Sequence, residues 1–268
     1  MRARATLAEI PEYNKPRYPG EVQDTLMALK IAYSNIRQQS MFLELRELKE
    51  KEMDNIKMLS FDMDGTITDL SFVESVWMEG VPSLFSQKNR MSFEDAKTFV
   101  KREYDKVGKE RLEWYNLDYW VRKLSLDASP KEILNSFQHR ITIFPEVTEA
   151  LQAFKEKGFR LIIVSSARRE FLDMELERTG ISHFFEHTFS STSDFGLTKK
   201  TTDIYHKVCS ICGVAPSELV HVGDDPDFDF DIPRKLGIKT FYLDRTGSHS
   251  GEMTVRNLKE LAEKVTLK

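Results

Sequence analysis

Short runs of apolar and β-branched residues recur along the second half of the chain, and between them apolar residues return every three or four positions. The runs read FRLIIVSS, HTFSS, LVHVGD and TFYLD. Such short runs are typical of buried strands, whereas the three-to-four periodicity is typical of helices that bury one face. The alternation over residues 141–268 therefore predicts an α/β fold, a Rossmann-like parallel sheet covered by helices on both faces.

One further strand is predicted upstream, where KMLSFD at residues 57–62 ends in an acid. The segment that follows, residues 70–140, has no clear strand pattern, and two of its helix starts are marked by capping boxes, Ser92 with Asp95 and Ser129 with Glu132. We therefore expect a core domain of residues 56–69 and 141–268, interrupted by an all-helical module of about three or four helices. Aromatic residues cluster in this module: Trp77, Trp114, Tyr115, Tyr119 and Trp120.

The N-terminal segment, residues 1–55, has a different character. Residues 1–20 contain four helix breakers, whereas residues 21–52 contain neither glycine nor proline. The second stretch predicts a long helix whose apolar face either packs on the chain's own domain or forms a homodimer, and the pattern leaves both open. The residues on this face are Val22, Leu26, Leu29, Tyr33 and Ile36.

Composition and charge narrow the classes of partner. The formal net charge is −4, so no basic field draws the protein to nucleic acid or to an anionic membrane. The chain starts without an apolar core of signal-peptide length, and no run of about 18 apolar residues occurs. Cys209 and Cys212 lie in a helical pattern without a second metal-binding pair, which favours buried apolar thiols over zinc or redox chemistry. We therefore expect a cytoplasmic protein without a nucleic-acid or membrane partner.

Two clusters of acidic residues follow predicted strands. The first begins at Asp62 and reads DMDGT, and the second, GDDPDFD at residues 223–229, follows LVHV. Either could be an ordinary polar turn or a solvated acidic loop. A calcium loop is excluded for the first cluster, since its glycine falls at the fourth position instead of the sixth. Carboxylates grouped at strand ends repel one another unless a cation or a proton is present, which indicates a ligand site.

The ordered set of motifs is more specific than either cluster alone. FDMDGT, a strand that ends in Ser165 and Ser166, the pair Lys199 and Lys200, and GDDPDFD follow one another along the chain. In this order they resemble the four motifs of the haloacid dehalogenase superfamily, over residues 57–250. The spacing of the first two acids and the GT that follows them match the phosphatase version of the first motif.

The resemblance implies a catalytic or substrate-binding role for each matching residue. Asp62 would be the nucleophile, and Asp64 would be the general acid and base. Ser165, with Ser166 beside it, would hold the phosphate. Counting forward from Gly196 favours Lys199 over Lys200 as the lysine that neutralises the phosphate. Thr66 would contact the substrate or orient Asp64, although a threonine at this position could also simply start a helix.

The resemblance also implies a magnesium ion. Asp62, the backbone carbonyl of Asp64, Asp224 and Asp229 would bind it, and whether Asp225 or Asp227 joins them is left open. Magnesium would reduce the repulsion between Asp62 and a phosphate dianion. Ser165 and the backbone N–H groups of residues 63–66 would hold the phosphoryl oxygens. Crowding by neighbouring carboxylates would raise the pKa of Asp64, as its acid–base role requires.

The helical module resembles the cap domain of that family, which closes over the site, excludes water and selects the leaving group. Residues 77–82 are the segment that we expect to contact the substrate. The leading hypothesis is a magnesium-dependent phosphatase that acts on a small phosphorylated metabolite through an aspartyl-phosphate. A phosphomutase, another hydrolase of the same scaffold and a non-catalytic binding protein are the alternatives. A dehalogenase would need neither Asp64 as an acid nor the second acidic cluster.

Overall fold

The computed structural model describes residue 31, residues 33–41 and residues 55–266. The chain divides into two units, Met1–Lys51 and Glu52–Lys268. In the first unit residues 33–41 are helical and exposed, and these include Tyr33 and Ile36. Most of the long helix predicted from the sequence, including Val22, Leu26 and Leu29, lies outside the described residues. Among the helices that the structure places, none combines the length and apolar character needed to cross a membrane.

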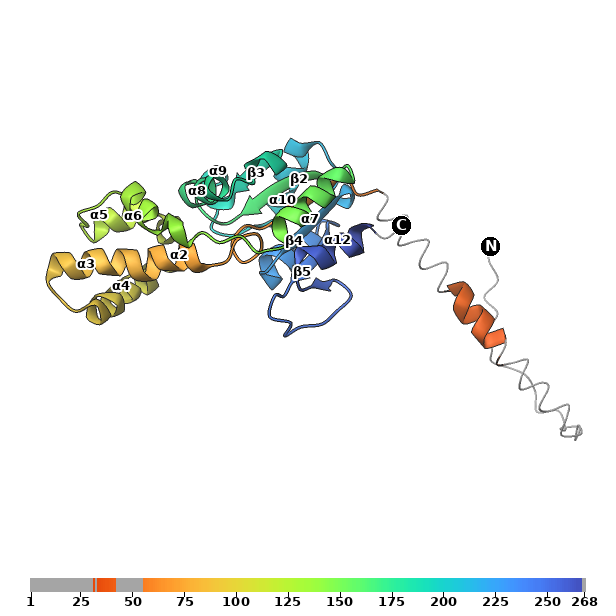
Figure 1. The fold of residues 1–268 in the computed structure, drawn as a ribbon, viewed down its shortest axis with the longest axis horizontal. Helices are drawn as coiled ribbons and strands as arrows, with labels where there is room; N and C mark the ends of the chain where they lie inside the picture. The colour runs from red at the N-terminus through yellow and green to blue at the C-terminus, as the bar shows by residue number, and fades with distance from the viewer. Residues whose placement is uncertain (1–30, 32, 42–54, 267–268) are drawn as a thin grey trace, which may run out of the picture. The chain divides into compact units, whose positions relative to one another are not determined.

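The second unit is built on a parallel six-stranded sheet with the order β3-β2-β1-β4-β5-β6 (Figure 1). This confirms the predicted Rossmann-like fold. The central strand β1 pairs with β2 on one side and with β4 on the other, so the order of strands reverses at β1. The strands are β1 Met58–Phe61, β2 Arg160–Ser165, β3 His187–Ser190, β4 Leu219–Gly223, β5 Lys239–Leu243 and β6 Thr254–Val255.

Side chains of the buried strands alternate between two apolar clusters, one on each face of the sheet. In β2, Leu161 and Ile163 join the first cluster, whereas Ile162 and Val164 join the second. Helices α7, α8 and α12 pack into the first cluster, and α10 and α11 pack into the second. The bounds of the helices outside the insert are α7 Val147–Glu156, α8 Arg169–Thr179, η4 Ser182–Phe184, α9 Ser191–Asp194, α10 Thr202–Cys212, η5 Pro216–Glu218, η6 Pro226–Asp231, α11 Ile232–Arg234 and α12 Leu258–Thr266.

Cys209 and Cys212 are free and buried in the second apolar cluster, on α10. Burial raises the pKa of each thiol to about 11. A thiol that stays protonated at neutral pH is a poor nucleophile and a poor metal ligand. Their placement therefore agrees with the predicted role as small apolar side chains.

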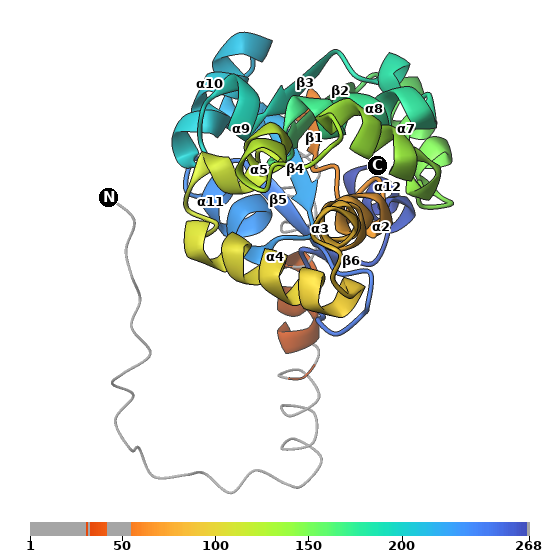
Figure 2. The same cartoon turned by 90° about the vertical axis from the view of Figure 1, so that its left-hand side faces the viewer.

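Residues 71–140 form an insert between β1 and β2 in which every regular element is helical. The predicted caps are present, because the Ser92 side chain accepts from the Asp95 amide, and Ser129 and Glu132 form a capping box. Figure 2 looks onto the insert with the strands of the sheet behind it. Its elements are α2 Ser71–Ser75, η1 Val76–Gly80, α3 Val81–Asn89, α4 Phe93–Val107, η2 Leu112–Tyr115, α5 Leu117–Lys123, α6 Pro130–Phe137 and η3 Gln138–Arg140.

The insert has an apolar cluster of its own, centred on buried residues such as Trp120, Leu117 and Val100. Phe171 on α8 of the core domain is a buried member of the same cluster, and Ala167 and Met174 of the core also pack against it. Because a buried aromatic ring contributes a large apolar area, Phe171 joins the two parts at the edge where the carboxyl ends of the strands lie. The insert therefore packs beside the position that a parallel sheet offers for a ligand.

Candidate active site

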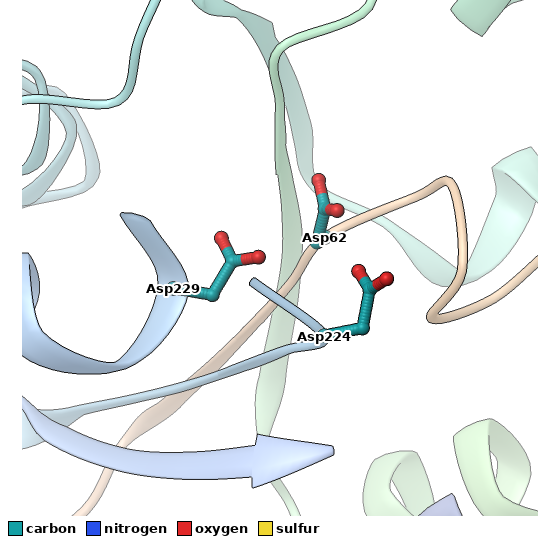
Figure 3. A group of neighbouring side chains, drawn as sticks. All are labelled: Asp62, Asp224 and Asp229. Carbon is teal, nitrogen blue, oxygen red and sulfur yellow. The ribbon is translucent and has the colours of Figure 1, made fainter. Parts of the chain in front are cut away.

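Three strand ends meet around one point at the carboxyl edge of the sheet. Asp62 directly follows β1, Ser165 ends β2, and Asp224 directly follows β4. Figure 3 shows the carboxylates of Asp62 and Asp224, from two of these strand ends, together with that of Asp229, which comes from a helical segment. One oxygen from each carboxylate lies within 4.8 Å of the other two. The predicted meeting of acids from two strand ends is therefore present in the described part of the chain.

The π-helix η6 carries Asp229 into this group. Asp225 caps the start of η6, because its Oδ1 accepts from the amides of Asp227 and Phe228 at 2.9 Å. Gly223 lets Asp229 approach β4, since a Cβ at Gly223 would lie 2.4 Å from the Asp229 carboxyl. Asp225 and Asp227 are therefore placed beside the carboxylate group and are not members of it.

The lysine of the site is Lys200 and not Lys199, which corrects the prediction from the sequence. Lys200 is buried, and its ammonium lies 2.6 Å from Asp62 Oδ1 and 2.5 Å from Asp229 Oδ1. Lys199 points elsewhere: its ammonium lies 2.8 Å from Glu110 of the insert and over the ring of Phe228. The loop before α10 has no periodic pattern, so counting from Gly196 could not decide which of two adjacent lysines faces inward.

A tight turn at residues 63–68 directly follows Asp62 and carries Asp64. Gly65 has a φ of 77°, and a Cβ there would lie 2.3 Å from Asp224 Oδ2, so only glycine fits beside the second acidic segment. Arg245 braces the turn by donating to the carbonyl oxygens of Gly65 and Thr66. The amides of Gly65 and Thr66 donate within the turn, to Thr68 and Met63. The prediction that the amides of residues 63–66 all hold phosphate is therefore wrong for these two.

The predicted phosphate-binding residues lie at two different depths. Ser165 is buried, and its Oγ accepts from the Ala167 amide at 3.0 Å, which leaves its hydroxyl proton for a ligand. Ser166 is half-buried and lines the cavity beside Asp62. The Thr66 hydroxyl instead lies 3.5 Å from Asp224 Oδ1 and lines neither cavity described below. This position of Thr66 supports a role in orienting Asp224. The expected contacts of Thr66 with the substrate or with Asp64 are not supported.

Glu175, on α8, is a buried acid that the sequence reading missed. It has no exposed surface and accepts from the Thr68 hydroxyl at 2.8 Å, while its Oε2 and Asp64 Oδ1 are both buried without a hydrogen-bond partner among the described residues. Burial raises the pKa of Asp64 to about 6, and the contact with Glu175 opposes this rise. Burial and then the charge of Asp64 raise the pKa of Glu175 well above its ordinary value. The protonated form of Glu175 is therefore favoured, and its proton reduces the repulsion between the two neighbouring carboxyl groups.

A second missed residue is His221, in the middle of β4. It is buried between Ser60 on β1, at 2.8 Å from Nδ1, and Asp229 Oδ1, at 3.0 Å from Nε2. Burial lowers its pKa, and the neighbouring Asp229 only partly opposes this. Neutral His221 thus donates from Nε2 to Asp229 and fixes the carboxylate from behind.

The charges of the site are arranged for a cation. Burial, opposed by Lys200, raises the pKa of Asp62 well above its ordinary value, and burial followed by Asp229 raises that of Asp224 to about 6. For Asp229 burial acts in the same direction, but Lys200 and then His221 outweigh it and lower its pKa to about 2. One buried ammonium does not neutralise three carboxylates. Hard oxygen donors this close together suit a divalent cation such as magnesium, so the residues present fit the ion that the sequence predicts.

Two cavities of about 180 Å³ each adjoin Asp64. They share Asp64, Ser166 and Ala167, so Asp64 lies between them. The polar cavity is lined further by Asp62, Ser165, Lys200, Asp224, Asp225, Phe228 and Asp229. The aromatic cavity is lined further by Val73, Trp77, Trp114, Tyr115, Arg168 and Phe171, which include the expected Trp77.

Comparison with known proteins adds to this geometry. The sequence model of the haloacid dehalogenase-like hydrolases matches residues 56–237. The chain is similar to the GMP/IMP nucleotidase YrfG of Escherichia coli, with 29% identity over 71% of this chain and 83% of that protein. It is also similar to the glyceraldehyde 3-phosphate phosphatase of Methanopyrus kandleri, with 26% identity over 75% of this chain and 89% of that protein.

The fold has solved counterparts. The chain is similar in fold to the crystal structure of a HAD phosphatase from Thermococcus onnurineus, with a TM-score of 0.70 and 23% identity. The match covers 79% of this chain and 98% of that one. The match therefore extends over nearly all of that protein, and it supports the fold.

Proposed function

The chain belongs to the haloacid dehalogenase-like hydrolase family, and from this premise we propose that it is a magnesium-dependent phosphatase that hydrolyses a small phosphorylated metabolite through an aspartyl-phosphate on Asp62. One observation carries the proposal. The carboxylates of Asp62, Asp224 and Asp229 converge with the buried Lys200 ammonium, while Asp64 lies between the polar cavity and the aromatic one. The three carboxylates and the lysine suit a phosphoryl group with a bound cation. Asp64 is placed to exchange a proton with a leaving group.

Asp62, Asp224 and Asp229 would hold the magnesium ion, together with the backbone carbonyl of Asp64. The ion would supply positive charge that offsets the repulsion between the substrate and Asp62 and stabilises charge on the phosphoryl oxygens. Lys200 adds to this from the protein, and the free hydroxyl proton of Ser165 can donate to a phosphoryl oxygen.

The chemical steps follow from the contacts of the two acids. Lys200 binds Asp62 Oδ1, so Oδ2 is the oxygen that attacks phosphorus. As the bond from phosphorus to the leaving oxygen breaks, Asp64 gives that oxygen its proton, which a pKa of about 6 makes available near neutral pH. Asp64 then takes a proton from water, the water oxygen attacks phosphorus, and inorganic phosphate and free Asp62 are released.

The named activities of the relatives support a small substrate. The Escherichia coli relative is a GMP/IMP nucleotidase and the Methanopyrus relative a glyceraldehyde 3-phosphate phosphatase, and both names describe small phosphate monoesters. Two cavities of about 180 Å³ are small compared with the ~300–1,000 Å³ typical of ligand pockets, which agrees with a substrate of this size. We place the enzyme in the cytoplasm, where the buried thiols of Cys209 and Cys212 stay reduced.

The proposal is tested with Asp62→Asn, assayed on an aryl phosphate with magnesium. We expect kcat to fall by about 10³-fold or more, since the nucleophile is lost. Asp227→Asn is the matched control, because Asp227 is exposed beside the same acidic group and is expected to leave the rate unchanged. Chelation of magnesium is expected to remove the activity of the unaltered chain.

Product analysis separates the alternatives. Release of one inorganic phosphate per ester cleaved excludes a phosphomutase, which would retain the phosphoryl group on an acceptor. An unchanged rate in Asp62→Asn would overturn the mechanism. Failure of the unaltered chain to hydrolyse any phosphate ester would instead favour a non-catalytic binding protein.

A further inference from the structure

The aromatic cavity on the insert side of Asp64 is walled mainly by rings. Trp77 comes from the π-helix η1, Trp114 and Tyr115 come from η2, and Phe171 comes from α8 of the core. The cavity therefore exists only where the insert and the core meet. Its other end is bounded by Asp64 and Ser166, which also line the polar cavity. A group bound here would be joined to a phosphate in the polar cavity across Asp64.

The rings hold one another in fixed orientations. Trp77 lies nearly parallel to Phe171, with centroids 5.6 Å apart and planes at 16°, and it is also stacked with Trp114 at 6.4 Å and 28°. Tyr115 stands edge-on to Trp114, at 4.8 Å and 66°. Packed aromatic rings lose little further freedom when a ligand binds, so this wall is prepared for a flat partner.

Few groups in this cavity can bind a polyhydroxylated ligand. Apart from the shared Asp64 and Ser166, its main charged group is Arg168, whose side chain is 24% exposed. Arg168 donates from Nε to Glu170 at 2.8 Å, and among the described residues no other partner is seen for its guanidinium. Its terminal N–H groups are therefore available to an acceptor on a ligand. A sugar would leave most of its hydroxyls without partners among these rings.

We propose that this cavity binds a leaving group that carries a planar heteroaromatic ring, as a nucleobase does, with Arg168 donating to an acceptor on that ring. The inference rests on the phosphatase function proposed above and names the class of its substrate. The volume of about 180 Å³ suits one ring system instead of a large ligand. Stacking on an aromatic side chain stabilises a bound base, which selects esters with a ring over esters without one.

The kinetic test compares adenosine and guanosine 5′-monophosphates with ribose 5-phosphate, which has the same phosphate and sugar but no base. We expect the unaltered chain to hydrolyse at least one nucleotide with a kcat/KM about tenfold or more above that for ribose 5-phosphate. Trp114→Leu and Arg168→Gln should each remove most of this preference, mainly through KM, and leave the rate on ribose 5-phosphate nearly unchanged. Phe99→Leu and Arg122→Gln, both exposed on the insert and away from the cavity, are the matched controls.

A binding measurement keeps the test independent of turnover. The chain has three tryptophans, and Trp77 and Trp114 line the cavity. Titration of the Asp62→Asn chain with the preferred nucleotide should therefore quench tryptophan fluorescence, whereas ribose 5-phosphate should not. Tyr115→Leu, which keeps all three tryptophans, should weaken the quenching without removing the fluorophores.

The outcomes separate this inference from the proposed function. Equal hydrolysis of ribose 5-phosphate and both nucleotides, or an equal loss on all of them in Trp114→Leu, would overturn the ring subsite while the phosphatase stands. Absence of hydrolysis of every ester, with quenching by a nucleotide, would support the subsite and overturn the phosphatase. Absence of both would overturn both.

Discussion

Lys200 and Lys199 are neighbours in the sequence with opposite surroundings, which makes them a direct test of the site. Lys200→Met would leave Asp62 and Asp229 buried without their ammonium, and breaking a buried ion pair costs about 3–5 kcal/mol. We expect kcat on an aryl phosphate to fall by about 10³-fold, since a charge that faces the phosphoryl group is lost. Lys199→Met removes a partly exposed pair with Glu110, worth about 0–1 kcal/mol, and a contact with the Phe228 ring, so kcat/KM should change by less than about fivefold.

The melting temperature of both variants, read by circular dichroism, controls for unfolding. A folded Lys200→Met chain with full activity, or a Lys199→Met chain as inactive as Lys200→Met, would contradict the assignment of the lysine.

Asp224 makes the stability of the fold depend on pH. Burial and the charge of Asp229 raise its pKa to about 6 in the fold, above its ordinary value. The folded state therefore favours the protonated carboxyl. The contribution of protonated Asp224 to the free energy of unfolding is therefore present at about pH 4 and is lost as pH rises through 6. In a chelator, Asp224→Asn should consequently be more stable than the unaltered chain at pH 8, by on the order of 1–3 kcal/mol, and should lose this advantage near pH 4.

Urea denaturation of both chains in EDTA at the two pH values measures this difference. Added magnesium should reverse the order at pH 8, because it binds the folded unaltered chain and stabilises it by mass action, whereas the variant has lost a ligand. An Asp224→Asn chain that is less stable in EDTA at pH 8 would show that Asp224 is not strained by its neighbours.

At the scale of elements, the turn after β1 depends on Gly65. Gly65→Ala would force an L side chain into a left-handed φ, at a cost of about 1–2 kcal/mol, and would also push the Asp224 carboxyl out of the site. Gly158→Ala has the same backbone cost, with a φ of 86°, but no atom within 4 Å of the new Cβ. We expect both variants to lose unfolding free energy, Gly65→Ala more than Gly158→Ala because its new Cβ clashes with Asp224. Only Gly65→Ala should lose magnesium binding, measured by calorimetry, and about 10²-fold or more in kcat.

Helices and strands with a regular pattern of apolar positions could be predicted from the sequence. The site residues that were missed are the ionisable side chains that interrupt such a pattern. The α8 sequence predicts a helix from its apolar positions, yet Glu175 stands on the same face as Phe171, Leu172 and Leu176. His221 likewise stands between buried valines in β4. An ionisable residue at a buried position is the signal that could have found both, since burying such a group without a partner is costly.

At the scale of the whole molecule, the sheet and the all-helical insert followed from periodicity, because each strand and helix buries a face that its own sequence reveals. The two-residue strand β6 is too short to leave such a signal. The joint between insert and core also could not be read from the sequence. Its contacts, such as those that bring Trp77 to Phe171 and Glu110 to Lys199, join residues far apart in the chain.

The N-terminal unit supplies the last prediction. All the site residues, and the three apolar clusters found among the described residues, lie within Glu52–Lys268, so a chain that begins at residue 52 should keep its fold and its kcat/KM. Ile31, Tyr33, Ile36 and Met41 are more than half exposed on the helical residues of the first unit, and apolar side chains of this size favour association. If the predicted homodimer forms through this helix, light scattering should give a dimer for the full chain and a monomer for the shortened one, at equal activity per chain. A shortened chain that stays folded but loses activity would show instead that the first 51 residues contribute to the site.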